Sequence, residues 1–177
     1  MTAASEPAQS RCALCSALSE RVVLDLRHAV ILLPLRAHIA AKDGGHLVVV
    51  PRRHEPSRMR LTPVEMLSME FGSLIASVAL TQVLGTDWFN YQENGNWSVE
   101  SADRHMHLHV YGRSKEAEVQ TYGEALRFPL RVQLDTWHVP SLSRQQAADI
   151  REAARSAAGS PDFGLLRDAL GELSRPV

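Results

Sequence analysis

The sequence predicts an α+β fold in which an antiparallel sheet of about five strands packs against helices on one side. Short β-rich runs come first, a long amphipathic helix pattern follows, and further β-rich runs lead to two helical patterns near the end. That order favours a sheet whose helices gather on one face. With 177 residues, 45% of them apolar, the chain is long enough for one domain with its own core and an appendage.

Composition narrows the possible functions. The formal net charge of −1 gives no reason to expect bulk electrostatic binding to nucleic acid or to a membrane. No run of about 18 apolar residues is present, so no transmembrane helix is expected. Residues 1–10 are polar, so we expect a flexible leader rather than a secretory signal, and a cytoplasmic protein. Cys12 and Cys15 form a C-x-x-C pair, which in a reducing compartment is typical of a metal half-site or a redox pair.

The first 51 residues predict two short strands, a loop and then a third strand. Residues 21–26 and 29–33 are β-rich and adjacent, which predicts a hairpin. A loop over residues 36–45 follows. Residues 46–50 (H-L-V-V-V) then predict a buried strand that Pro51 stops.

One long helix is predicted after these strands. Thr62 is a suitable N-cap, Pro63 suits the first helical position, and Glu65 can cap reciprocally. Apolar residues recur at helical spacing from there to about Leu84, where Gly85 ends the helix.

Two more strands follow the helix. Residues 88–92 predict a short strand, and the Asn-Gly pair in residues 93–96 predicts a turn. Residues 105–111 alternate histidine with apolar residues and predict another strand, which Gly112 ends.

The remainder of the chain gives weaker signals. Residues 126–134 contain two short β-like runs broken by Pro129. Residues 143–158 carry a capped helical pattern, and residues 163–173 predict a short amphipathic helix.

The histidine strand is the most informative segment. It reads His105-Met106-His107-Leu108-His109-Val110-Tyr111. Alternate side chains of a strand share a face and lie roughly 6–7 Å apart, so the three histidines line one side while the apolar residues between them face the other. Such an array suits a metal site or a neutral imidazole nucleophile oriented through its other nitrogen. The strand alone does not decide between them.

Four elements, in order along the chain, resemble the histidine triad (HIT) family. H-M-H-L-H-V-Y resembles the family signature H-φ-H-φ-H-φ-φ, and G-G-H-L-V-V-V-P-R-R-H resembles its G-H-x-L-V-I-P-K-x-H segment. Asn94-Gly95 resembles the asparagine that precedes the triad. The Cys12 and Cys15 pair resembles the C-x-x-C of zinc-containing bacterial members. The resemblance covers roughly residues 11–113.

This resemblance implies a fold, an activity and an assembly. Family members have an antiparallel sheet with two helices and usually form homodimers. They transfer or hydrolyse nucleotidyl groups on nucleoside phosphoramidates, aminoacyl adenylates or dinucleoside polyphosphates. We therefore expect a HIT domain over residues 1–113 and a strand and helix extension over residues 114–177, packed on the domain or on the dimer.

Three histidines take catalytic roles by the same resemblance. His107 matches the nucleophile, which would carry a nucleotidyl group between two displacement steps. His109 matches the third histidine of the triad and would position the phosphate or the nucleophile. His46 matches the histidine that begins the neighbouring strand and would set a tautomer within the triad.

The substrate-binding positions depart from the family pattern. Asn94 matches the residue at the phosphate or ribose end of the pocket, although a plain turn residue fits equally well. Family members carry G-Q-[S/T] before the triad, and here Ser101 and Ala102 stand at the Gln and Ser positions. His38 stands where many members have the Asp that receives the ribose hydroxyls, so either Asp43 holds the ribose or the ligand is not an ordinary nucleoside.

A structural zinc site is also implied. Cys12, Cys15, His54 and His105 match the ligands of zinc-containing members, and two thiolates with two imidazoles form a closed tetrahedral site. The alternative is that both cysteines are ordinary buried thiols and that His54 is a surface residue.

Several functional alternatives stay open at this point. The chain could be a phosphorylase-like relative that uses phosphate as acceptor, or a hydrolase with zinc at the triad itself. It could also be a nucleotide-binding or interaction module with weak or no catalysis, which the absent G-Q-[S/T] element favours. In the tail, Trp137 could reach a partner's site or pack in the core.

Overall fold

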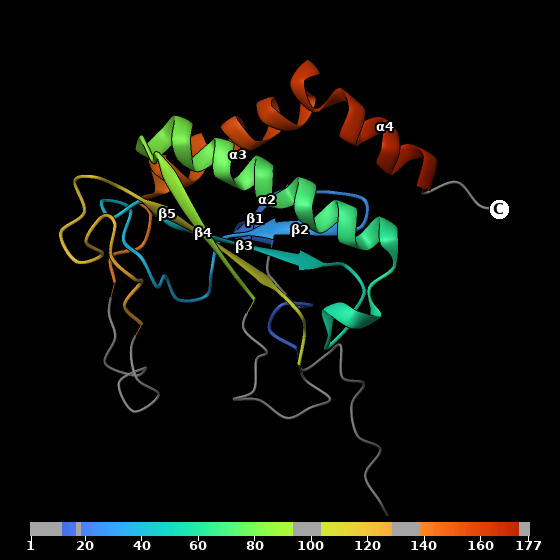
Figure 1. Ribbon diagram of the computed structural model, residues 1–177, viewed down its shortest axis with the longest axis horizontal. Helices are drawn as coiled ribbons and strands as arrows, with labels where there is room; N and C mark the ends of the chain where they lie inside the picture. The colour runs from blue at the N-terminus through green and yellow to red at the C-terminus, as the bar shows by residue number, and fades with distance from the viewer. Residues whose placement is uncertain (1–11, 17–18, 94–103, 129–138, 174–177) are drawn as a thin grey trace, which may run out of the picture.

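The protein forms a five-stranded antiparallel sheet with its helices on one side (Figure 1). The structure is a computed structural model and describes residues 12–16, 19–93, 104–128 and 139–173. The strand order is β1-β2-β3-β5-β4. The strands are β1 (Val22–Asp25), β2 (Ala29–Leu32), β3 (His46–Pro51), β4 (Trp88–Glu93) and β5 (Leu108–Arg113). The helices are α2 (Pro63–Leu84), α3 (Arg144–Gly159) and α4 (Gly164–Leu173), with 3-10 turns at Ser19–Arg21, Arg58–Arg60 and Pro161–Phe163. The predicted fold class is confirmed.

The long helix α2 is the centre of the core, and its predicted ends are confirmed. The Thr62 side chain accepts from the backbone N–H of Glu65, while the Glu65 carboxylate accepts from the backbone N–H of Thr62. Gly85 ends the helix in the left-handed conformation, with φ of 66°. Among the described residues α2 alone has the length and composition to cross a membrane. More than half of its most apolar stretch is buried inside the fold, as in the core helix of a globular protein.

The sheet has one apolar face and one face that carries the histidines. Leu47, Val49, Leu108 and Val110 belong to the core with α2. Since side chains alternate along a strand, His46 and the residues at its register on β5 point away from α2. This alternation places the histidines of β3 and β5 together on the face of the sheet opposite α2.

The histidine strand is shorter at its start and longer at its end than predicted. Pairing of β5 with β3 begins at Leu108, opposite Val49, because β3 ends at Pro51, which has no N–H to donate. The N–H of Met106 bonds instead to the carbonyl of Glu55, at 2.7 Å.

The predicted end of this strand at Gly112 is wrong, because β5 continues through that residue to Arg113. A Cβ atom at Gly112 would lie 2.0 Å from the carbonyl oxygen of Gly44. The glycine therefore serves the close approach of the loop before β3 to this strand, rather than a chain end.

The C-terminal helices pack on the same side of the sheet as α2. Ser143 and Gln146 form the predicted capping box at the start of α3. Along α3, Ile150 and Ala154 are fully buried in the core that α2 occupies. The predicted helices at 143–158 and 163–173 are confirmed. No strand forms over residues 126–128, and the rest of the β-like region, with Trp137, lies outside the described residues.

Candidate functional site

A cluster of aromatic rings lies on the face of the sheet opposite α2, where β3 and β5 are neighbours. His46 pairs with Tyr111 across the two strands, and the Nε2 atom of His46 lies 2.9 Å from Nδ1 of His109. His38, in the loop before β3, packs its ring 4.9 Å from the His46 ring and 5.1 Å from the His109 ring. His46 and His109 are 2% and 6% exposed.

The hydrogen bonds of this cluster define which ring nitrogen of His46 and of His109 carries the proton. The backbone N–H of His38 donates to Nδ1 of His46 at 3.3 Å, so the proton of a neutral His46 resides on Nε2. That proton is then donated to Nδ1 of His109, which leaves the His109 proton on Nε2. His109 therefore presents an N–H donor, a suitable partner for a phosphate oxygen.

His107 has the geometry of an oriented nucleophile. Its Nδ1 lies 2.9 Å from the backbone carbonyl oxygen of His105, and only a protonated Nδ1 can donate to that oxygen. A neutral His107 then carries an unprotonated Nε2. Burial lowers the pKa of His107, although the His105 carbonyl and the charge of Glu93 offset part of the effect. The lone pair of Nε2 is therefore available at neutral pH.

Burial keeps the rest of the cluster neutral as well. It lowers the pKa of His109 to about 3, with help from His107 and His38. Burial lowers the pKa of His46 well below its usual value, with additional repulsion from His109 and His38. Burial also raises the pKa of the Tyr111 phenol. The chain of hydrogen bonds from His38 through His46 to His109 requires His46 and His109 to be neutral, and the lowered pKa values agree with that.

We expect stability to fall as the pH is lowered from 7 to 5. Because the folded-state pKa values of His46 and His109 are lowered, the unfolded chain binds protons below pH 6.5 that the folded chain does not. Their stabilisation is complete above pH 6.5 and is lost as the pH falls, by about 1.4 kcal/mol per histidine per pH unit. Urea unfolding at several pH values measures this loss. The His46→Asn, His109→Asn double variant should lose less, and an equal loss in both proteins would contradict the prediction.

A second cluster brings Cys12, Cys15, His54 and His105 together. The Sγ atom of Cys15 lies 3.2 Å from Nδ1 of His54 and 3.3 Å from Nδ1 of His105. The Sγ atom of Cys12 lies 3.6 Å from the same His105 nitrogen. All four potential ligand atoms lie within 4.8 Å of one another.

The donor set of this second cluster fits a zinc ion. His105 directs Nε2 to the carbonyl oxygen of Pro51 at 2.9 Å, which leaves Nδ1 as the free ligand atom, as is usual for metal-bound histidine. Burial and the neighbouring Cys12 raise the pKa of the Cys15 thiol to about 12, so two adjacent thiolates need a cation between them. Zn²⁺ supplies that charge and prefers two thiolates with two imidazoles in a tetrahedral site.

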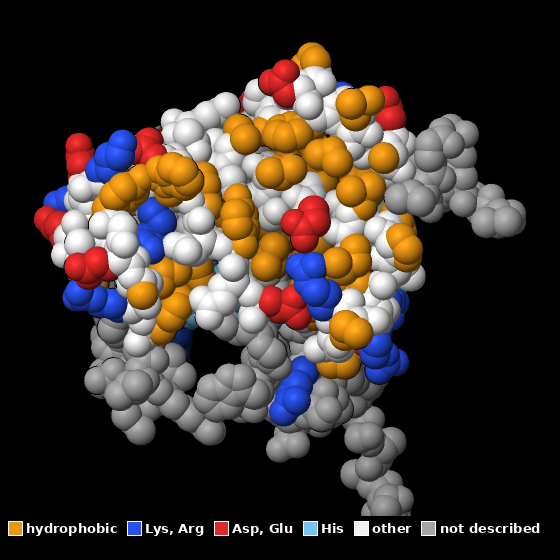
Figure 2. Space-filling model, viewed as in Figure 1, with side chains coloured by type: hydrophobic (Ala, Val, Ile, Leu, Met, Phe, Trp, Pro, Cys, Tyr) orange, Lys and Arg blue, Asp and Glu red, His pale blue; other side chains and the backbone are white. Residues whose placement is uncertain are grey.

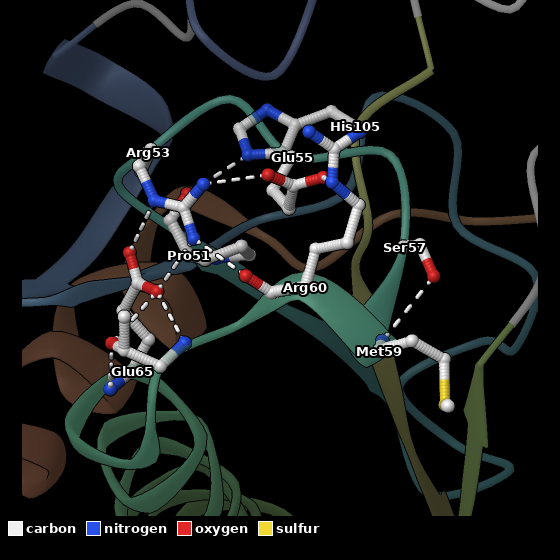
Figure 3. Close-up of polar contacts among 9 residues, drawn as sticks. Pro51, Arg53, Glu55, Ser57, Met59, Arg60, Glu65 and His105 are labelled. Carbon is white, nitrogen blue, oxygen red and sulfur yellow. Dashed lines mark hydrogen bonds and ion pairs between the residues drawn. The ribbon is translucent and has the colours of Figure 1, made fainter.

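An arginine holds the turn that carries His54. Figure 3 shows Arg53 between Glu65, at the start of α2, and Glu55. The Arg53 guanidinium donates to both oxygens of Glu65 at 2.9 Å and to Glu55 at 2.6 Å. Arg53 in turn lowers the pKa of Glu65 to about 2. These bonds fix the turn after β3 against the first turn of α2, and so they orient the two residues that flank Arg53.

The two clusters share the backbone of His105. Its side chain belongs to the cysteine cluster, whereas its carbonyl accepts from His107. The predicted metal residues thus converge on one point, and His46, His107 and His109 converge on another. Asn94 and Ser101 lie outside the described residues. The catalytic and substrate-binding roles of all these residues stay predictions.

Sequence reasoning missed two members of the ring cluster. Tyr111 accompanies His46 and His109, with ring centroids 4.6 and 5.3 Å away, and its place four residues after His107 on the same strand face is a signal that strand periodicity offers. Phe128 packs 5.4 Å from Tyr111 and comes from the extension, where no sequence pattern pointed to the site.

Comparison with known proteins identifies the fold. No protein-family model matches the sequence, and a search of curated proteins finds no match. Among solved structures, a Zn-bound histidine triad family protein from Mycobacterium smegmatis is similar at a TM-score of 0.59 and 17% identity, over 85% of this chain and 97% of that one. A histidine triad protein from Bradyrhizobium japonicum is similar at a TM-score of 0.53 and 19% identity, over 80% and 94% of the two chains.

A larger protein shares the same fold. A uridylyltransferase structure is similar at a TM-score of 0.53 and 19% identity, over 82% of this chain but only 45% of that one. The chain therefore has the α+β fold of histidine triad proteins, which is also present within the uridylyltransferase.

Proposed function

We propose that this chain is a nucleotidyl hydrolase or transferase that forms a covalent nucleotidyl intermediate on His107. The carrying observation is the bond from Nδ1 of His107 to the carbonyl of His105, which aims an unprotonated Nε2 away from the backbone. The fold shared with histidine triad proteins and a uridylyltransferase supports the same chemistry. Nucleoside phosphoramidates and dinucleoside polyphosphates are the proposed substrates.

The reaction proceeds in two displacements. Nε2 of His107 attacks the α-phosphorus, a phosphorus–nitrogen bond forms, and the bond to the leaving group breaks; the leaving group departs with the electron pair and takes a proton from solvent. In the second step the oxygen of water, or of another acceptor, bonds to the same phosphorus and loses its proton to solvent. The phosphorus–nitrogen bond breaks, and its electron pair returns to Nε2 of His107. The N–H of His109 donates to a phosphate oxygen as charge builds on it, while His46 keeps that proton on the correct nitrogen.

Intact-protein mass spectrometry tests the intermediate directly. The protein is mixed with adenosine phosphoramidate, quenched without acid and weighed, and released AMP is measured in parallel. A mass increase of one adenylyl group, or AMP release, supports the proposal. Folded protein that binds AMP with neither adduct nor release would favour the alternative of a nucleotide-binding module without catalysis.

We also propose that the Cys12, Cys15, His54 and His105 cluster holds a structural zinc ion. A zinc ion would join the segment that carries both cysteines to the turn after β3 and to the residue that begins the triad. Metal bound by four protein ligands has no open position, so its contribution is to stability rather than to catalysis. Its binding free energy adds to the folding free energy.

We further propose that the chain forms a homodimer through strand β4. β4 lies at the edge of the sheet and pairs only with β5 among the described strands. Trp88 and Tyr91, on opposite faces of this strand, are 65% and 48% exposed. Figure 2 shows apolar side chains gathered on the side of the molecule that carries α2 and β4. An exposed edge strand with apolar side chains is a template for pairing with a second chain.

Tyr91→Lys is expected to convert such a dimer into a monomer. A charge on an edge strand opposes strand pairing, so light scattering should fall from the mass of two chains to 19.6 kDa. Leu165→Lys is the matched control, because Leu165 is 87% exposed on α4, far from β4 in the sequence. A monomeric wild-type protein, or a dimeric Tyr91→Lys variant, would contradict the β4 interface.

A further inference from the structure

The rings of His38, His46 and His109 form a three-histidine cluster that surrounds one point. The centroids of the three rings lie 4.9, 5.0 and 5.1 Å from one another, so they form a nearly equilateral triangle. Each residue offers one ring nitrogen, and the three nitrogens lie within 4.8 Å of one another. The imidazoles therefore present three nitrogens to a common centre.

These distances are close to those of three imidazoles around one metal ion. With metal–nitrogen bonds of about 2.0–2.1 Å at tetrahedral angles, neighbouring ligand nitrogens lie about 3.3 Å apart and ring centroids about 5.2 Å apart. Nε2 of His46 and Nδ1 of His109 already lie 2.9 Å apart. A metal ion between these two nitrogens needs them to separate by only about 0.4 Å.

The sheet fixes the positions of two of the three histidines. Val48 on β3 is the register partner of His109 on β5, so His46 lies two residues along β3 from that partner and on the same face. Diagonal neighbours of this kind are within reach of aromatic side chains. Strand pairing therefore holds His46 and His109 together before any ion binds.

The third histidine, His38, lies in the loop before β3, and two sets of contacts hold it there. The Asp43 carboxylate of this loop accepts from the backbone N–H groups of Glu118 and Gln120, at 2.7 and 3.2 Å. The Tyr111 hydroxyl lies 2.7 Å from Nδ1 of His38. Such a partner orients the ring, as the hydrogen-bond partners of metal-bound histidines do.

The nucleophile is not a member of this ligand set. Nδ1 of His107 lies 2.9 Å from the carbonyl oxygen of His105, and the side chain of His105 belongs to the cysteine cluster. The three-histidine cluster therefore differs from a metal site at the triad itself, because its members come from a loop and two strands. His38 and His46 each line a cavity, of about 220 and 240 Å³, through which an ion can approach.

We infer that His38, His46 and His109 bind Zn²⁺, or a similar late first-row divalent cation, through one ring nitrogen each. Three imidazoles with the fourth position open to water are a ligand set that Zn²⁺ takes in proteins, and imidazole also suits Cu²⁺ and Ni²⁺. With three protein ligands and no thiolate, this site holds its ion more weakly than the cysteine cluster does, and it fills when metal is added. Metal binding here is independent of nucleotidyl transfer to His107.

The protons of the cluster balance when the ion binds. The metal replaces the proton that lies between Nε2 of His46 and Nδ1 of His109. That proton moves to Nδ1 of His46, and the 3.3 Å bond from the backbone N–H of His38 is given up. All three imidazoles stay neutral, and His109 keeps its proton on Nε2.

Titration of the full chain with Co²⁺ tests this site, because the absorption of Co²⁺ reports its ligands. For the wild type we expect an ion with visible d–d absorption but without the near-ultraviolet charge-transfer band that thiolate ligands give. In His38→Ala the affinity for that ion should fall at least about 100-fold, since loss of even an outer-shell partner costs about 10–100-fold. His28→Ala is the matched control, between β1 and β2, and should bind Co²⁺ as the wild type does. Identical Co²⁺ spectra and affinities in the wild type and His38→Ala, or no Co²⁺ bound without the thiolate band, would overturn the inference.

Anomalous diffraction from wild-type crystals soaked in Zn²⁺ needs no substitution, so the test stays decisive even if His38→Ala fails to fold. A zinc peak within bonding distance of the ring nitrogens of His38, His46 and His109 supports the site. Zinc peaks confined to the cysteine cluster or to other residues would overturn it. The adenylyl adduct on His107 is measured separately, so failure of either proposal is recognised without the other.

Discussion

Replacing His107 with alanine is expected to abolish the covalent adduct and to lower kcat for phosphoramidate hydrolysis by at least about 10⁴-fold. The loss is large because His107 supplies the attacking lone pair, and its bond to the His105 carbonyl is what orients that lone pair. The decrease in kcat is measured from AMP release in a discontinuous assay, and the loss of the adduct is measured by intact-protein mass spectrometry.

His28→Ala serves as the matched control for this variant. His28 lies between β1 and β2, and it is not one of the residues of the ring cluster, so its removal should leave turnover within about threefold of wild type. Thermal unfolding of both variants shows that each is folded. An His107→Ala protein that still forms the adduct would refute the nucleophile assignment.

Removing the two cysteines is expected to cost both zinc and stability. The Cys12→Ser, Cys15→Ser variant should lose one zinc ion per chain by elemental analysis. It should also unfold at a temperature lower by about 10 °C, since loss of a structural zinc costs several kcal/mol. The physical reason is that the cysteine segment joins the sheet through this cluster, with Cys15 in contact with His54 and His105.

Adding a chelator to both proteins tests whether loss of the metal itself accounts for the loss of stability. Chelation should destabilise the wild type by about the same amount as the double substitution, and it should leave the variant unchanged. If the metal content of the variant equals that of the wild type, the ligand set is incorrect. If chelation abolishes turnover while stability is unaffected, the zinc acts at the triad rather than in the cysteine cluster.

The sequence by itself determined the fold class, the ends of the helices and the cysteines and histidines of the two clusters. Helix ends were predictable because capping is local: Thr62 and Glu65 lie three residues apart and bond within one turn. The histidine array was predictable because alternation along a strand fixes which side chains share a face. The four metal-ligand candidates followed from a family resemblance, and the structure brings them within 4.8 Å of one another.

The tertiary structure alone decided how those residues are oriented and what surrounds them. Sequence reasoning left open whether Asp43 holds a ribose, and only the fold shows its oxygens bonded to backbone groups more than 70 positions away. The passage of β5 through Gly112 depends on the approach of Gly44. The packing of Phe128 against Tyr111 depends on the hydrogen bonds that the side chains of Arg113 and Gln120 make to the segment before Phe128. Such contacts join segments distant in sequence, and neither periodicity nor local propensity carries information about them, because the partners meet only after the sheet has formed.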